Sequence, residues 1–150
     1  MVTVDCSFEL DCNEKKFFKI LTDYENLSKY LPRHLQKLEI LDEHDNYTTI
    51  KTAVFARSLI KKAFSQEMKI EKKSENNLSV ELLDGFTKGS HVTISTQMQK
   101  EKTVCDVNLD IKLSLKTAIL YPIIKRECRG FLLRIFTKMS IDAKQAKEEF

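Results

Sequence analysis

Four cysteines and three histidines are the side chains of this 150-residue chain best suited to nucleophilic, redox or metal chemistry. The cysteines are Cys6, Cys12, Cys105 and Cys128, which form no Cys-X-X-Cys pair and have no histidine at the spacing of a zinc site. A reactive thiolate also needs a positive neighbour, and the sequence assigns none to these residues. We therefore predict free thiols that are buried in the core, and no metal site.

The histidines and acidic residues give little sign of acid–base catalysis. His34 follows the helix-ending pair Pro32-Arg33, His44 adjoins a predicted hairpin turn, and His91 falls on the outward side of its predicted strand. The carboxylates of the predicted strands alternate outward as well: Glu67, Glu71, Asp106 and Asp110. Acid–base catalysis needs such a group inside a pocket. The pattern predicts no catalytic residue and no cofactor, and it favours a binding protein over an enzyme.

The composition is that of one soluble domain over residues 1–150. Hydrophobic residues make up 42% and charged residues 31% of the chain, with only three glycines and two prolines. The net charge, 25 basic minus 22 acidic residues, is +3, which is too low to indicate a nucleic-acid partner. The longest apolar run, Ala118 to Ile124, is far short of the roughly 20 residues that span a bilayer, and no secretory signal is visible at the start. We expect a cytoplasmic protein.

Hydrophobic periodicity divides the chain into a strand, two short helices, six strands and a long helix. Strict alternation predicts the first strand over Val2–Leu10. Asp11 and Glu14 have the spacing of a capping box and predict a short helix, and a second one from about Glu25 to Tyr30 ends before Pro32. Period-two runs then predict six strands: Leu35 to Glu43, Tyr47 to Arg57, Lys62 to Lys72, Leu78 to Leu83, Ser90 to Gln99 and Thr103 to Leu115.

The last segment, from about Ala118 to Glu149, has the clearest helical pattern. Its apolar residues are spaced by three or four and so share one stripe: Leu120, Ile124, Cys128, Phe131, Ile135 and Met139. The predicted sheet is the only surface large enough to receive this stripe. The sequence therefore predicts an α+β architecture, with the helices packed on one face of a seven-stranded antiparallel sheet.

Basic residues project to roughly the opposite side of this last helix: Lys125, Arg126 and Arg129. With Leu133 and Phe136 beside them, they would suit peripheral contact with an anionic membrane. A ribosome or an acidic protein would use the same charges, and solvated charge on an exposed helix face is the simpler interpretation.

The order of elements, together with the segment from Phe18 to Pro32, resembles the START-like helix-grip superfamily. In that segment an Asp23-Tyr24 turn precedes the second short helix and Pro32 ends it, as in the helix pair near the start of these proteins. The superfamily includes plant pollen-allergen-type carriers, lipid-transfer START domains, polyketide cyclase/dehydrase-type proteins and the coenzyme Q-binding START subfamily. The resemblance implies that the sheet wraps around the long helix and leaves an internal cavity for an apolar ligand.

The lining of such a cavity follows from taking, in each predicted strand, the alternate set that carries the apolar residues. The predicted strand residues are Thr52, Val54, Ala56, Phe64, Gln66, Met68, Val80, Leu82, Val92, Ile94, Thr96, Val107 and Leu109, and the helices add Tyr24, Leu27, Tyr30, Ile124, Phe131 and Ile135. Small side chains at Thr52, Ala56 and Thr96 would leave room, and the amide of Gln66 would orient a carbonyl or hydroxyl group. Tyr24, Leu27, Tyr30 and Leu31 would close one end, where a ligand enters. Ordinary core packing is the alternative for each position.

Three hypotheses of function follow. The leading one is a carrier that binds an apolar small molecule, such as a lipid, an isoprenoid or quinone, or an aromatic compound. The second is an enzyme that resembles polyketide cyclases or dehydratases, in which Gln66, Thr52 or a tyrosine positions a substrate. The third is an interaction module that docks on a membrane or a ribosome through Lys125, Arg126 and Arg129.

Overall fold

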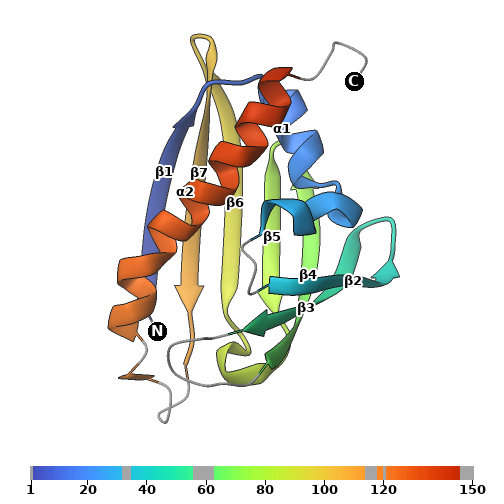
Figure 1. Ribbon diagram of the computed structural model, residues 1–150, viewed down its shortest axis with the longest axis vertical. Helices are drawn as coiled ribbons and strands as arrows, with labels where there is room; N and C mark the ends of the chain where they lie inside the picture. Colours follow the sequence, from blue (N-terminus) through green and yellow to red (C-terminus); the bar gives the residue numbers. More distant parts are fainter. Residues whose placement is uncertain (1, 32–34, 56–62, 114–117, 120, 146–150) are drawn as a thin grey trace.

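A computed structural model describes residues 2–31, 35–55, 63–113, 118–119 and 121–145 (Figure 1). The chain runs through β1 (Val2–Leu10), α1 (Glu14–Leu21), the 3-10 helix η1 (Tyr24–Tyr30), β2 (Leu35–Glu43), β3 (Tyr47–Phe55), β4 (Ala63–Ser74), β5 (Asn77–Leu82), the 3-10 turn η2 (Gly85–Thr87), β6 (His91–Gln99), β7 (Lys102–Ile111) and α2 (Tyr121–Gln145). This is the predicted order, and it confirms the α+β helix-grip architecture.

The strands form one antiparallel sheet of seven strands in the order β1-β7-β6-β5-β4-β3-β2. Consecutive hairpins build most of it, and β7 returns to pair with β1 in a continuous register from Val2↔Ile111 to Leu10↔Thr103. α2 crosses one face of this sheet diagonally, and α1 and η1 lie on the same side (Figure 1). In the described part of the chain, helices therefore cover one face of the sheet and not the other, which matches the alternation of apolar and polar residues along β1.

The start of α1 differs from the prediction. The N-terminal cap is Asn13, whose Oδ1 accepts a hydrogen bond from the Lys16 backbone amide at 3.1 Å, and not Asp11. Asp11 instead accepts a hydrogen bond from the Lys144 ammonium at 2.7 Å, and this contact keeps the pKa of the Asp11 carboxyl below its ordinary value. The residue predicted to cap α1 thus joins the start of α1 to the end of α2.

The buried side of α2 is also broader than the predicted stripe. Ile135 and Met139 are buried as expected, but Phe136 and Ala143 are buried with them. The ring of Phe136 packs edge-on against Phe8 and Phe17, with centroid distances of 5.5 and 5.8 Å. The prediction that Phe136 belongs to an outward docking face is therefore wrong, because α2 packs against both β1 and α1 and so buries a wider arc than one surface would.

Some strand ends also differ from those predicted from the sequence. The last strand, predicted to reach Leu115, ends at Ile111, and β4 continues to Ser74 instead of ending at Lys72. Leu120 lies outside the described residues. No helix in the described ranges is long and apolar enough to cross a lipid bilayer.

Candidate ligand-binding cavity

A cavity of about 400 Å³ lies between the sheet and α2, with α1 and η1 bordering it. It brings together eleven of the predicted residues: Tyr24, Leu27, Gln66, Met68, Val80, Leu82, Val92, Ile94, Leu109, Phe131 and Ile135. The pleat of the strands explains why these strand residues were predicted correctly, because alternate residues of β4, β5 and β6 point to the same face of the sheet. The antiparallel register then sets these residues side by side, as in the pairs Met68↔Leu82 and Val80↔Val92.

The cavity also contains apolar residues that the predicted site did not include. These are Leu21, Leu38, Ile50, Ile70, Leu78, Cys128, Leu132, Phe136 and Met139. The alternation rule places some of them correctly, since Ile50 and Ile70 belong to the inward sets of their strands and Leu78 shares its face with Val80. Leu31, which was predicted to close one end of the cavity, lines it as well. Leu21 ends α1, and nothing in the sequence indicates how that helix is oriented over the sheet.

Four predicted residues lie elsewhere. Thr96 is buried beneath α1, where its hydroxyl donates to Glu14 Oε1 at 3.1 Å. Val107 is buried opposite Cys6, at the β1–β7 pair, and Ile124 is half-buried near the start of α2. Tyr30 does not line the cavity, and its hydroxyl donates to Asp142 on α2. The inward face of the sheet is larger than the cavity, so Thr96 and Val107 face inward without lining it.

Four further predictions remain open because they fall on the β3–β4 hairpin. Ala56 lies outside the described residues, and so do the side chains of Thr52, Val54 and Phe64. The backbone register pairs Thr52 with Gln66 and Val54 with Phe64. Their part in the cavity stays a prediction.

The role predicted for the Gln66 amide is wrong. Gln66 lines the cavity, but its Nε2 donates to Asp84 O at 2.9 Å and Asp84 Oδ1 at 3.1 Å, and its Oε1 accepts from the Thr87 hydroxyl at 3.1 Å. The amide therefore holds the loop between β5 and β6 in place instead of orienting a ligand. Gly85 belongs to this arrangement: its φ is +76°, and a Cβ there would lie 3.4 Å from Gln66 Oε1.

The cavity lining carries no charged side chain and no histidine among the described residues. Its polar side chains besides Gln66 are Tyr24 and Cys128. Burial raises the pKa of both the Tyr24 phenol and the Cys128 thiol, so each stays protonated near neutral pH. Such a lining suits an apolar molecule, and none of its described groups would transfer a proton near neutral pH.

All four cysteines are free, as predicted. Cys6, Cys12 and Cys105 are buried, whereas Cys128 is half-buried at the cavity. Burial raises the pKa of Cys105 to about 12, so its sulfur is a protonated thiol with little nucleophilic character.

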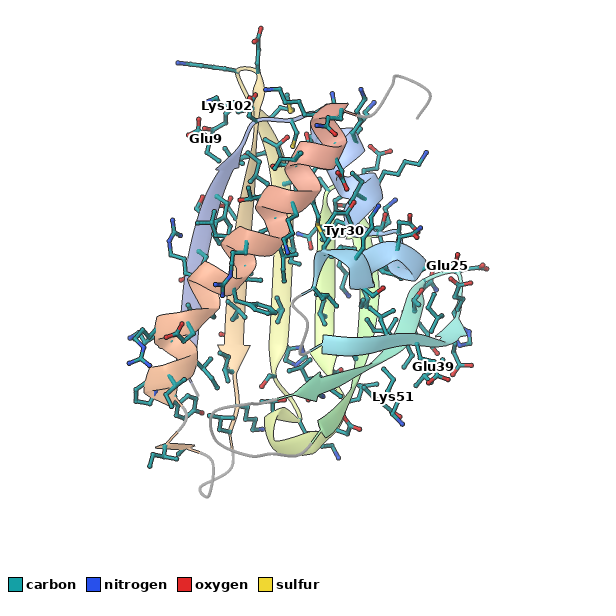
Figure 2. All side chains as sticks on the ribbon, viewed as in Figure 1. Glu9, Glu25, Tyr30, Glu39, Lys51 and Lys102 are labelled. Atoms are coloured by element: carbon teal, nitrogen blue, oxygen red, sulfur yellow. The ribbon has the colours of Figure 1, made fainter. Side chains whose placement is uncertain are left out.

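Tyr30 fastens the end of η1 to α2. Tyr30, labelled in Figure 2, is 4% exposed. Its hydroxyl donates to Asp142 Oδ2 at 2.6 Å. Lys29 Nζ lies 3.8 Å from the same carboxylate oxygen. Burial, and then the hydrogen bond and negative charge of Asp142, raise the pKa of the Tyr30 phenol. Tyr30 therefore holds one of the elements that border the cavity.

Replacing Tyr30 with phenylalanine should lower the free energy of unfolding by about 1.5 kcal/mol, because the hydrogen bond to a carboxylate is lost. Since the folded state raises the phenol pKa, this contribution is complete below about pH 10, the ordinary tyrosine value, and falls as pH rises through the folded-state value. Urea unfolding of the parent protein and of Tyr30→Phe, at neutral and at alkaline pH, measures the difference in their free energies of unfolding. The difference between them should shrink at alkaline pH, and a constant difference would contradict the assignment.

The predicted docking residues are exposed on α2, but two of them have partners within the chain. Arg126 Nε donates to Glu127 Oε1 at 2.9 Å. Arg129 Nη1 donates to Ser7 O at 3.4 Å, and its guanidinium lies 5.1 Å from the centre of the Phe8 ring. Lys125 is exposed, and so is Leu133. With Phe136 buried, this surface has less apolar area than predicted, and docking on a membrane or ribosome stays a prediction.

No protein-family profile matches this sequence, and neither does any curated protein. Solved structures do match. A START superfamily protein from Mycobacterium smegmatis is 14% identical, with 95% of this chain and 97% of that one covered and a TM-score of 0.75. The Zhui aromatase/cyclase from a Streptomyces species is 10% identical, with 92% of this chain and 93% of that one covered and a TM-score of 0.72.

Norcoclaurine synthase from Thalictrum flavum, solved in complex with dopamine and hydroxybenzaldehyde, is 14% identical, with 97% of this chain and 89% of that one covered and a TM-score of 0.74. At these identities the likeness establishes the fold. It confirms the fold predicted from the sequence.

Proposed function

We propose that this chain, which has the helix-grip fold of START-like proteins, binds a hydrophobic small molecule in the cavity between the sheet and α2. The observation that supports this most directly is the cavity of about 400 Å³, whose lining is almost entirely apolar. Candidate ligands are a lipid, an isoprenoid or quinone, or an aromatic compound, and the protein would act as a carrier.

The energetics of such binding need only burial. Removing about 300 Å² of apolar ligand surface from water contributes on the order of 7 kcal/mol at roughly 25 cal/mol per Å², before the cost of association. That is enough for measurable affinity without a charged contact. A carrier also has to release its ligand, and a lining without ionic contacts suits reversible binding.

A cyclase-like enzyme is the second candidate, because an aromatase/cyclase is among the proteins that share the fold. The described lining argues against it, since it lacks a carboxylate, a histidine and a lysine that could move protons. We therefore favour binding without chemistry.

Native mass spectrometry of the purified protein, followed by solvent extraction, tests the proposal. We expect one apolar molecule per chain, or, where the protein is purified empty, stoichiometric uptake of the neutral dye Nile red. An empty protein that also fails to take up Nile red would contradict a binding function. Conversion of an extracted ligand on incubation would favour the enzyme.

A further inference from the structure

The thiols of Cys6 and Cys128 lie against each other between β1 and α2. Cys6 is in β1 and is 6% exposed, whereas Cys128 is half-buried in α2 and lines the cavity. Burial, and then the neighbouring Cys6, raise the pKa of the Cys128 thiol, and a side-chain hydrogen bond joins the two residues. Two reduced sulfurs from distant parts of the sequence are therefore in contact.

Contacts of the adjacent residues fix this meeting point. Arg129, which follows Cys128 in α2, donates from Nη1 to the backbone oxygen of Ser7, which follows Cys6 in β1, at 3.4 Å. Its guanidinium lies 5.1 Å from the centre of the Phe8 ring. α2 passes over β1 at this place (Figure 1). The two sulfurs thus belong to one crossing of helix and strand, and they need to approach only from hydrogen-bonding to bonding distance.

The part of α2 that carries Cys128 is weakly held. Residues 121–134, all of which the structure describes, are half-buried or exposed, and the buried residues of α2 begin at Ile135. Gly130 is exposed, and a Cβ there would meet nothing within 4 Å, so packing does not require a glycine at this position. A glycine inside a helix lowers its stability. Segments with few buried contacts open at low cost, and a covalent link from this half of α2 to β1 would suppress such opening.

The same half of α2 covers part of the cavity. Cys128, Phe131 and Leu132 line it, and all three are half-buried. Opening of this half would expose the cavity to solvent, and holding it closed would retain what the cavity contains. A bond at Cys128 therefore acts on the side of the cavity that α2 forms.

We propose that Cys6 and Cys128 form a redox modification site, which a hydroperoxide converts to a disulfide that fastens the first half of α2 to β1 and slows ligand exchange. The modification does not depend on the proposed binding function, whereas its effect on ligand exchange rests on that function.

The reaction balances with hydrogen peroxide as the oxidant. The sulfur of Cys128, the more exposed of the two, takes one oxygen from the peroxide to give a sulfenic acid, and one water leaves. The sulfur of Cys6 then displaces that oxygen: the S–S bond forms, the S–O bond breaks, and the Cys6 thiol proton leaves in a second water. The two sulfurs give two electrons to the peroxide, and a dithiol reductant reverses the change.

The rates of the two steps differ. Because the Cys128 thiol is protonated near neutral pH, its oxidation by peroxide is slow. The second step is fast, because the Cys6 thiol is already in contact with the oxidised sulfur. The disulfide should therefore form without accumulation of the sulfenic acid.

Peroxide treatment of the reduced chain tests this, followed by alkylation of the remaining thiols under denaturing conditions and mass spectrometry of the peptides. We expect two of the four thiols to be lost, in one pair of peptides that links Cys6 to Cys128 within a single chain and that dithiothreitol separates. The oxidised protein should unfold about 5–10 °C above the reduced protein. It should release Nile red about tenfold more slowly, because α2 opens less often.

Cys128→Ala and Cys12→Ala are the matched variants, because each removes one thiol and only the first breaks the pair. After peroxide treatment, Cys128→Ala should gain neither the linked peptides nor the thermal stabilisation, whereas Cys12→Ala should gain both. Thermal unfolding of the reduced variants shows that each is folded before it is oxidised.

Other outcomes overturn the proposal. Four free thiols after peroxide treatment, a link between other cysteines or between two chains, or a sulfinic acid at Cys128 in place of a disulfide would show that the pair is no such site. Equal unfolding temperatures would show that the bond does not fasten α2, and unchanged release of Nile red would overturn the effect on exchange. If the reduced protein does not bind Nile red at all, the proposed binding function fails and the effect on exchange fails with it, while the linked peptides still decide whether the disulfide forms.

Discussion

Truncation of Phe136 to alanine should lower the free energy of unfolding by about 3–5 kcal/mol. The side chain is 2% exposed and packs edge-on against Phe8 of β1 and Phe17 of α1, so it links α2 to both of the elements that begin the chain. It also borders the cavity between the sheet and α2. Its removal therefore enlarges an existing space, which the surrounding side chains cannot close by small shifts.

Urea unfolding measures this change, and Leu133→Ala provides the control. Leu133 lies three residues away on the same helix but is 43% exposed, so its truncation should change the stability by only about 0.5 kcal/mol. Similar losses for the two variants would contradict the orientation of α2 on the sheet.

The fold was largely predictable because the sheet has a strong local signal. The period-two pattern from Val2 to Leu10 gave the bounds of β1 as the structure has them, and the run from Leu35 to Glu43 did the same for β2. Each strand of such a sheet has one face against the helices and one face toward solvent. Apolar and polar residues therefore alternate along the strand, and this alternation is visible in the sequence.

The errors arose where a residue's surroundings come from distant segments. Asp11 has a side chain suited to a helix cap, yet Asn13 caps α1, because Asp11 meets Lys144 from the far end of the chain. Phe136 falls beside the expected apolar stripe, yet it is buried because α1 covers that side of α2. Neither contact can be predicted from the local periodicity of the sequence, because each joins segments that are far apart in the chain.

The same limit applies to the site. Alternation identified which side chains face inward, but it did not show which of them border empty space. Thr96 and Val80 both face inward, and only Val80 lines the cavity, because α1 covers Thr96. The engagement of Gln66 by Asp84 and Thr87 could not be foreseen either, since it depends on how the loop after β5 folds back.

The double replacement Val80→Phe and Val92→Phe should abolish most ligand binding. The two valines are opposite each other in the β5–β6 register, both are half-buried and both line the cavity. Two larger rings would occupy space that a ligand needs. Displacing about 110 Å² of ligand contact at roughly 25 cal/mol per Å² costs about 2.7 kcal/mol, which weakens binding about 100-fold.

The stability of this variant distinguishes a filled cavity from a damaged core. Because the rings enter existing space, thermal unfolding should be unchanged or slightly raised, whereas a tightly packed core would be destabilised by about 1–3 kcal/mol. Thr93→Phe is the control, since Thr93 alternates with Val92 and faces the other side of the sheet, beside Asp106 and Asn108. It should leave Nile red binding unchanged. A stable double variant that still binds Nile red with full affinity would place the ligand outside this cavity, because the two larger rings would occupy the space beside β5 and β6 that the ligand needs.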